Sequence, residues 1–114
     1  MTSMTRPGSE VTTKIKLYYG TSHKSGLDIF SDGLWKLKPP GLRMVDSIDL
    51  AKSECGTDGV ILELDVHRHL ELTDKGEGVF MFEIPASEEE CYYSFEGLYI
   101  VGVLDSDGNR ILHK

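Results

Sequence analysis

The chain has 114 residues, of which 39% are hydrophobic and 27% are charged, as in ordinary soluble globular proteins with one modest core. No apolar run approaches the ~20 residues that a membrane-spanning helix needs, so no membrane partner is expected. The net charge of -7 disfavours nucleic acid as a partner, because the phosphate backbone selects basic surfaces.

The N-terminal segment MTSMTRPGSEVTT is polar and lacks the apolar stretch of a secretory signal. We interpret residues 1–13 as a flexible leader and residues 14–114 as a single domain. Cys55 and Cys91 are the only cysteines. Free thiols in a cytoplasmic or other intracellular compartment are therefore favoured, with a single disulfide as the alternative.

The domain opens with a strand followed at once by a helix. Residues 14–19 contain β-branched and aromatic side chains, which predict a strand. Thr21 or Ser22 can cap a helix over residues 23–32, because a hydroxyl accepts a hydrogen bond from an amide of the first turn. Gly33 fits the left-handed position that ends many helices.

Two short strands and a second helix follow. Residues 34–37 and 42–45 are the expected strands, separated by KPPG, where two prolines remove backbone donors. Asp46 or Ser47 can cap the helix that comes next. Its apolar face consists of Ile48, Ala51 and Cys55.

The second half of the chain predicts strands. Residues 60–66 alternate with a period of two, so that Glu63 and Asp65 point away from the apolar face. Residues 67–72 are a candidate continuation of this strand, and TDKGEG is expected to be a turn. Residues 79–84 form the next strand. Early helices and late antiparallel strands indicate an α+β domain.

A hairpin is expected at the end of the chain, because residues 98–104 and 110–113 flank the turn sequence DSDGN. No metal site is predicted, since His67 and His69 have no third ligand at a suitable spacing. Neither a nucleophile elbow nor a phosphate-binding glycine loop is present in the sequence.

Several segments give the chain a wider pattern. LYYGTSHKSGLDIFSDGL joins a strand ending in Gly-Thr-Ser to a helix that carries Ile29 and Gly33. GLRMVDSIDLAKS, GVILELDV, GEGVFMFEIP and EGLYIVGV follow in order. Together they resemble the ADP-ribosyltransferase superfamily, in particular poly(ADP-ribose) polymerase catalytic domains and RNA 2′-phosphotransferases. The alternative is an unrelated small α+β domain with a chance Gly-Thr-Ser turn.

The resemblance implies a small split β-sheet, mixed or antiparallel, with two short helices near the N-terminal half. It also implies NAD as a substrate and no metal. In this family the bond between nicotinamide and ribose is broken. Such a reaction needs an aromatic surface, backbone groups for the amide, and a carboxylate beside the developing positive charge.

The opening motif supplies most of the candidate site residues. Gly20 matches the family glycine whose backbone holds the nicotinamide amide. Thr21 and Ser22 match the hydroxyl positions after it, and helix capping explains both equally well. Tyr19 stands in the position of the family histidine, where its hydroxyl can bind a ribose hydroxyl.

Two further candidates depart from the polymerase pattern. Arg43 occupies the position of the tyrosine that stacks on nicotinamide, where a planar guanidinium can stack or bind phosphate. Leu98 falls near the position of the catalytic glutamate, and Glu96, two residues earlier on the same strand face, is the candidate carboxylate. Ordinary surface residues are the alternative for both Arg43 and Glu96.

These residues support three functions in decreasing order. The first is a diverged domain that binds NAD or an ADP-ribose-like nucleotide and transfers ADP-ribose if catalysis survives. It predicts that Tyr19 and Arg43 converge on one concave pocket, and it fails in favour of the second function if they lie on separate convex surfaces. The second is a catalytically inactive module with a protein partner at the surface around Trp35 and the pair Tyr92 and Tyr93. The third is RNA 2′-phosphate removal, which needs a basic cleft from Lys24, Lys36, Lys38 and Arg43.

Overall fold

The computed structural model describes residues 14–67, 70–87, 91–93 and 96–113, and not the side chains of Cys91 and Tyr92. The expected leader and His69 lie outside these residues. The elements are β1 (Lys14–Ser22), α2 (His23–Asp32), β2 (Trp35–Leu37), β3 (Gly41–Val45), α3 (Ile48–Cys55), β4 (Gly59–His67), β5 (Thr73–Gly76), β6 (Val79–Glu83), β7 (Cys91–Tyr93), β8 (Leu98–Asp105) and β9 (Arg110–His113).

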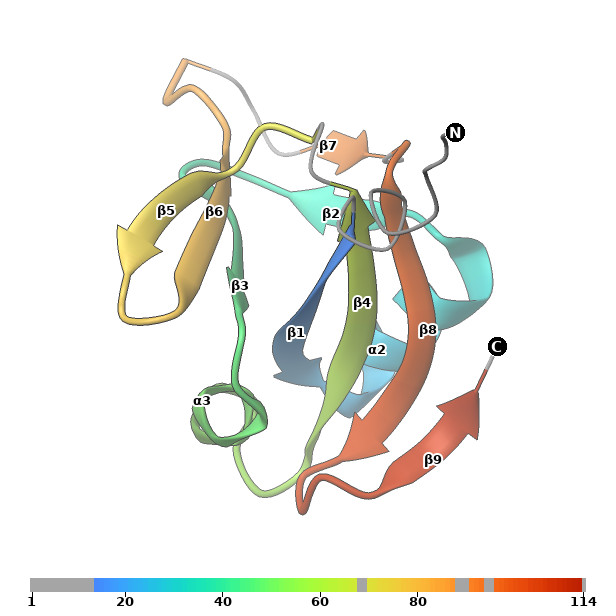
Figure 1. Cartoon of the computed structure of the whole chain (residues 1–114). Helices are drawn as coiled ribbons and strands as arrows, with labels where there is room; N and C mark the ends of the chain where they lie inside the picture. The colour runs from blue at the N-terminus through green and yellow to red at the C-terminus, as the bar shows by residue number, and fades with distance from the viewer. Residues whose placement is uncertain (1–13, 68–69, 88–90, 94–95, 114) are drawn as a thin grey trace, which may run out of the picture.

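The strands form two antiparallel sheets, which confirms the α+β class (Figure 1). One sheet has seven strands in the order β5-β6-β3-β1-β4-β8-β9, and the other pairs β2 with β7. Strand β4 lies between β1 and β8 and is buried along most of its length, because both of its faces are covered.

The two helices pack on opposite faces of the large sheet. On one face α2 and β2 enclose the main core, which includes Ile29, Trp35 and Leu62. On the other face α3 packs Ala51 against Ile61 in a smaller cluster. The expected apolar face of the second helix is thus confirmed, since Ile48 and Cys55 also contact this cluster.

Capping explains where the first helix begins and ends. The Ser22 hydroxyl accepts a hydrogen bond from the Ser25 amide at 3.2 Å, which satisfies a donor of the first turn. Gly33 has a φ of 70° and donates its amide to the Ile29 carbonyl at 2.7 Å. The predicted range 23–32 and the left-handed end at Gly33 are therefore confirmed.

The structure corrects several expected strand limits. TDKGEG is not wholly a turn, since Thr73–Gly76 forms β5 and only Glu77 and Gly78 connect it to β6. Both connecting residues have positive φ, as two-residue hairpin turns of this kind require. Strand β1 continues to Ser22 because its last residues pair with the start of β4. Strand β7 has no counterpart in the sequence-based elements.

Candidate functional site

A cleft opens beside α2, where β1 ends and β2 begins. Its volume is about 470 Å³. We call it the α2 cleft. It is lined by Tyr19, Thr21, Lys24, Ser25, Asp28, Ile29, Asp32, Leu34 and Lys36.

Three consecutive elements build the α2 cleft. Strand β1 places Tyr19 and Thr21 on the face that points toward α2, as their partners Leu62 and Val60 also belong to the main core. The cap at Ser22 starts the helix immediately after the strand, and Gly33 ends it one residue after Asp32. The chain then returns along β2, so the cleft follows directly from the opening motif.

Tyr19 is held in place by an aromatic contact. Its ring meets the Trp35 ring edge-on, with centroids 5.2 Å apart. Trp35 is only 2% exposed and belongs to the main core. Tyr19 is half-buried, so its ring joins the floor of the cleft to the hydrophobic interior.

Acidic and basic side chains are balanced in the α2 cleft. Lys24 and Lys36 supply two ammonium groups, and Asp28 and Asp32 supply two carboxylates. The Lys24 Nζ lies 3.0 Å from Asp28 Oδ2, one helical turn away. The cleft therefore has no strong excess of positive charge and does not provide the basic cleft that an RNA 2′-phosphate would need.

Gly20 lies beneath α3 and does not line the α2 cleft. A Cβ at this position would come within 2.5 Å of the Ala51 carbonyl oxygen and 2.9 Å of the Cys55 amide nitrogen. Glycine is thus required here for the close packing of a helix on a strand. The backbone that the resemblance assigns to nicotinamide is covered by α3 on this side.

Arg43 lies on the opposite face of the sheet from Tyr19. Its guanidinium forms an ion pair with Glu54 of α3. The neighbouring Met44 belongs to the main core, which places Arg43 on the other face of β3. The first function predicted that Tyr19 and Arg43 converge on one pocket. This prediction is wrong, because the two residues lie on opposite faces of the sheet.

Glu96 lies in the turn before β8 and not on a strand face. It is exposed and does not contribute to the α2 cleft. Leu98 is the first residue of β8 and is buried in the main core. Of the six candidate residues, Tyr19 and Thr21 line the cleft, Ser22 caps the adjoining helix, and Gly20, Arg43 and Glu96 lie elsewhere.

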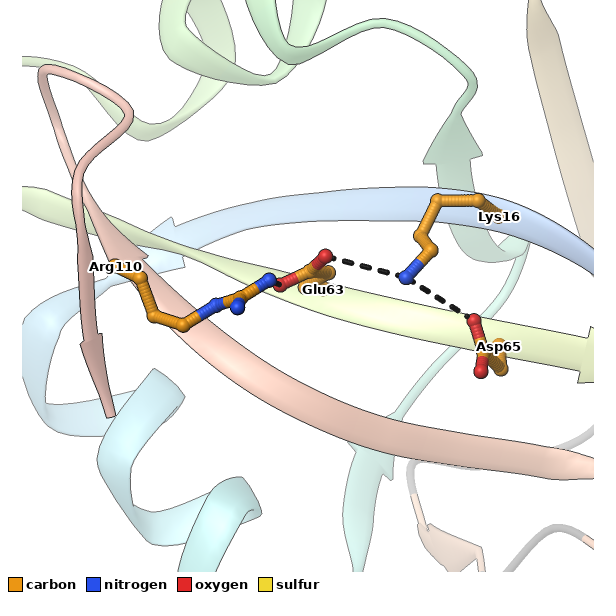
Figure 2. A network of polar contacts seen from close by, with 4 residues as sticks. All are labelled: Lys16, Glu63, Asp65 and Arg110. Atoms are coloured by element: carbon orange, nitrogen blue, oxygen red, sulfur yellow. Dashed lines mark hydrogen bonds and ion pairs between the residues drawn. The ribbon is translucent and has the colours of Figure 1, made fainter. Parts of the chain in front are cut away.

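A network of ion pairs crosses three strands on the face of the sheet that α3 also covers (Figure 2). Glu63 of β4 is buried, at 7% exposure, although the alternation had placed it on a polar face. Its carboxylate lies 2.6 Å from Arg110 Nη2 and 3.2 Å from Lys16 Nζ, and Lys16 also reaches Asp65 at 3.3 Å.

The pKa values of Glu63, in this network, and of Cys55, on α3, are shifted by their respective surroundings. Burial alone would raise the pKa of the Glu63 carboxyl, but hydrogen bonds from Arg110 and Lys16 outweigh it and lower that pKa. Burial raises the pKa of the Cys55 thiol, against an opposing backbone hydrogen bond. Cys55 is a free cysteine, and the raised pKa keeps it in the poorly nucleophilic thiol form.

A second, shallower hollow of about 550 Å³ lies between residues 70–73 and strand β6. None of the candidate site residues lines it. Among the described residues, no group of three or more His, Cys, Asp or Glu side chains could hold a metal ion. Across the same residues, no helix is both long and apolar enough to cross a membrane.

Sequence reasoning missed the two carboxylates of the α2 cleft, Asp28 and Asp32, and named Lys24 and Lys36 only for the basic cleft of the third function. Lys24, Asp28 and Asp32 recur every four residues along the helix that follows the opening motif. This spacing places the three side chains on one helical face, and from it their common location could have been predicted. The place of Lys36 beside this helix could not be assigned, since it depends on how β2 returns past the helix.

Comparison with known proteins returned no match to a protein-family model, to a curated protein or to a solved structure. The fold and the cleft therefore define the class on their own. The chain is a small α+β domain with helices on both faces of an antiparallel sheet and a ligand-sized cleft beside its first helix.

Proposed function

We propose that this chain is an ADP-ribosyltransferase-like domain that binds an ADP-ribose-like nucleotide in the α2 cleft and does not transfer it. One observation carries the proposal. Tyr19 and Thr21, two residues that the resemblance assigns to the nucleotide, line the same cleft. They reach it from the end of a strand, where tight turns expose polar groups to ligands.

The size and chemistry of the α2 cleft support a nucleotide. Its volume of about 470 Å³ lies within the range of ~300–1,000 Å³ that is usual for small-molecule sites. Tyr19 offers part of an aromatic ring, and Thr21 and Ser25 offer hydroxyls that donate or accept hydrogen bonds. Lys24 and Lys36 offer ammonium groups to a diphosphate.

Binding without transfer of ADP-ribose follows from two candidate residues, Glu96 and Gly20, that do not line the α2 cleft. Transfer requires a carboxylate beside the ribose carbon on which positive charge develops. Glu96, the carboxylate that the resemblance assigns to this role, is not in the cleft, and the backbone of Gly20 is covered by α3. The proposed ligand is therefore ADP-ribose or a part of it, and the nicotinamide of NAD adds no favourable contact.

Isothermal titration with ADP-ribose and NAD tests this function. ADP-ribose should bind the wild-type chain, and NAD should bind no more tightly. Thr21→Val, which keeps the β-branched shape and removes the hydroxyl, should weaken ADP-ribose binding about fivefold, as expected for one lost hydrogen bond. Arg43→Gln is the matched control on the opposite face and should bind as the wild type does.

Two results would contradict binding in the α2 cleft. One is the absence of heat and of chemical-shift change at millimolar ADP-ribose. The other is a loss of binding in Arg43→Gln with none in Thr21→Val, which would place the ligand on the α3 face. Release of nicotinamide from labelled NAD would contradict the absence of transfer, with Glu96→Ala as the control for its origin.

A second function is favoured by the separation of Tyr19 and Arg43 on opposite faces. In this function the same fold serves as an inactive protein-interaction module. Trp35 cannot be its contact residue, because it is buried. The exposed large hydrophobic residues near one edge of the sheet are Tyr99, Ile111 and Leu112. A chain that binds no ADP-ribose would favour this function over the first.

A further inference from the structure

The carboxylate of Asp32 differs from the other acidic group of the α2 cleft in its lack of a partner among the described residues. Asp32 is the last residue of α2, and its side chain lines the cleft and is exposed. Asp28, one turn earlier, is paired with Lys24 at 3.0 Å. Within the part of the chain that the structure describes, Asp32 has neither a hydrogen-bond partner nor an ion-pair partner for its side chain.

The helix itself disfavours a carboxylate at this position. Aligned peptide dipoles give the C-terminal end of a helix a partial negative charge, which repels an anionic side chain. The last turn of α2 contains no basic residue that could offset this repulsion. Asp32 therefore costs the helix stability, and residues that oppose their local structure in this way are often found at functional sites.

A carboxylate in this position can recognise a hydrogen-bond donor on a ligand. Its two oxygens only accept hydrogen bonds, and together they can accept both hydroxyls of a vicinal diol. They can also accept an exocyclic amino group of a base. Leu34 and Lys36, which also line the cleft, can supply an apolar contact and a cation.

We infer that Asp32 determines the specificity of the α2 cleft by accepting hydrogen bonds from a donor group of the nucleotide. The donor is the ribose diol or the amino group of the base. The inference rests on the proposed function, since it requires a nucleotide in the cleft. It goes further, because it names the group that is recognised and the residue that recognises it.

The test uses AMP, which carries one ribose diol and one exocyclic amino group. Affinities for AMP, 2′-deoxy-AMP and IMP are measured by titration with the wild-type chain and with Asp32→Asn. AMP binding should weaken about tenfold in Asp32→Asn, as for a lost hydrogen bond to a charged group. If Asp32 recognises the diol, the wild-type chain prefers AMP over 2′-deoxy-AMP and Asp32→Asn loses that preference. If Asp32 recognises the amino group, the wild-type chain prefers AMP over IMP and Asp32→Asn loses that preference.

Thermal unfolding provides a second measurement, in which Asp32→Asn should gain stability although it loses affinity for AMP. Asp32→Asn should raise Tm, because it removes a negative charge from the C-terminal end of α2. Asp49→Asn is the matched control, since Asp49 lies in the first turn of α3 and outside the cleft. It should lower Tm and leave AMP binding unchanged.

The inference is overturned if Asp32→Asn binds AMP as the wild type does and keeps both preferences. It is also overturned if Tm falls in Asp32→Asn, because the residue would then be structural. These outcomes differ from failure of the proposed function, in which the wild-type chain itself binds neither AMP nor ADP-ribose.

Discussion

Two neighbouring hydroxyls at the end of β1 have different roles, although the sequence assigned them together. Thr21 lines the α2 cleft, whereas the Ser22 hydroxyl accepts a hydrogen bond from the Ser25 amide. The side-chain alternation of a strand separates them, since adjacent residues point to opposite faces. Their contributions to binding and stability should therefore be separable by mutation.

Ser22→Ala should destabilise the chain by about 1 kcal/mol, because the first turn of α2 loses its capping acceptor. ADP-ribose affinity should change less than twofold, since Ser22 is absent from the cleft lining. Urea denaturation and titration measure the two effects. A large loss of affinity with unchanged stability would mean that Ser22 binds the ligand and that its capping contact is incidental.

Glu63 should make stability depend on pH. Its pKa in the folded chain is lowered from the ordinary value of 4.5, so the unfolded chain binds the proton first as pH falls. The stabilisation is therefore complete above pH 4.5 and is lost as pH falls through the folded pKa. Glu63→Gln should be about 1 kcal/mol less stable at pH 7. The expected loss is small for a buried carboxylate, because solvent screens its partly exposed partners Lys16 and Arg110.

Urea denaturation of both chains between pH 7 and pH 3 checks this dependence. The difference in unfolding free energy should be constant from pH 7 to about pH 5 and should shrink below it. A difference that persists unchanged at pH 3 would assign the effect of Glu63→Gln to packing and not to charge.

Strand β9 is attached to the sheet by more than its backbone pairing. Arg110, its first residue, reaches across β8 to the buried Glu63 of β4 (Figure 2). The ion pair thus joins the outermost strand on this side to β4, which lies two strands further in. Removal of Arg110 leaves the Glu63 carboxylate with Lys16 as its remaining partner.

Arg110→Ala should cost about 1–2 kcal/mol of stability and increase amide hydrogen exchange in β9, since a buried carboxylate loses a partner. Arg43→Ala is the matched control. Its partner Glu54 is more exposed than Glu63, so the loss should stay below ~1 kcal/mol. Equal losses in the two variants would contradict a special role for the Arg110 pair.

Elements with a strong local signal were predictable from the sequence. The helix at residues 23–32 has a capping serine, a terminal glycine and an apolar face, and all of these are local. Strand β5 was missed because TDKG carries no apolar alternation and is held by pairing with β6. The face of β3 on which Arg43 lies depends on strand register, which is set by residues far away in the sequence.

The site was predictable in part for the same reason. Tyr19 and Thr21 share a face because they are two residues apart on one strand, which local periodicity reveals. Glu96 could not be placed, because its expected position depended on where β8 begins. Gly20 is covered because α3 packs closely against β1 at this residue, and no pattern in the sequence specifies that contact.

The charge of the whole molecule should govern how binding depends on salt. The chain carries a net charge of -7, while the α2 cleft contains equal numbers of Lys and Asp side chains. An anionic ligand is thus repelled at long range, and within the cleft the attraction of Lys24 and Lys36 is offset by Asp28 and Asp32. Screening by salt should weaken the repulsion.

ADP-ribose affinity should therefore stay constant or rise when NaCl is increased from about 20 mM to about 200 mM, over which the Debye length falls from ~20 to ~7 Å. Titration at the two concentrations measures it. A steep fall in affinity would indicate a basic site and would favour the RNA 2′-phosphate function that ranks third.

Everything proposed for this domain requires that a nucleotide binds beside α2 and not on the α3 face. A chemical-shift titration of the backbone amides with ADP-ribose tests it most directly. Saturable shifts are expected at Thr21, Lys24, Asp32 and Lys36, with little change at Arg43 and along α3. Shifts that concentrate on α3 and Arg43, or no shifts at millimolar ligand, would contradict it.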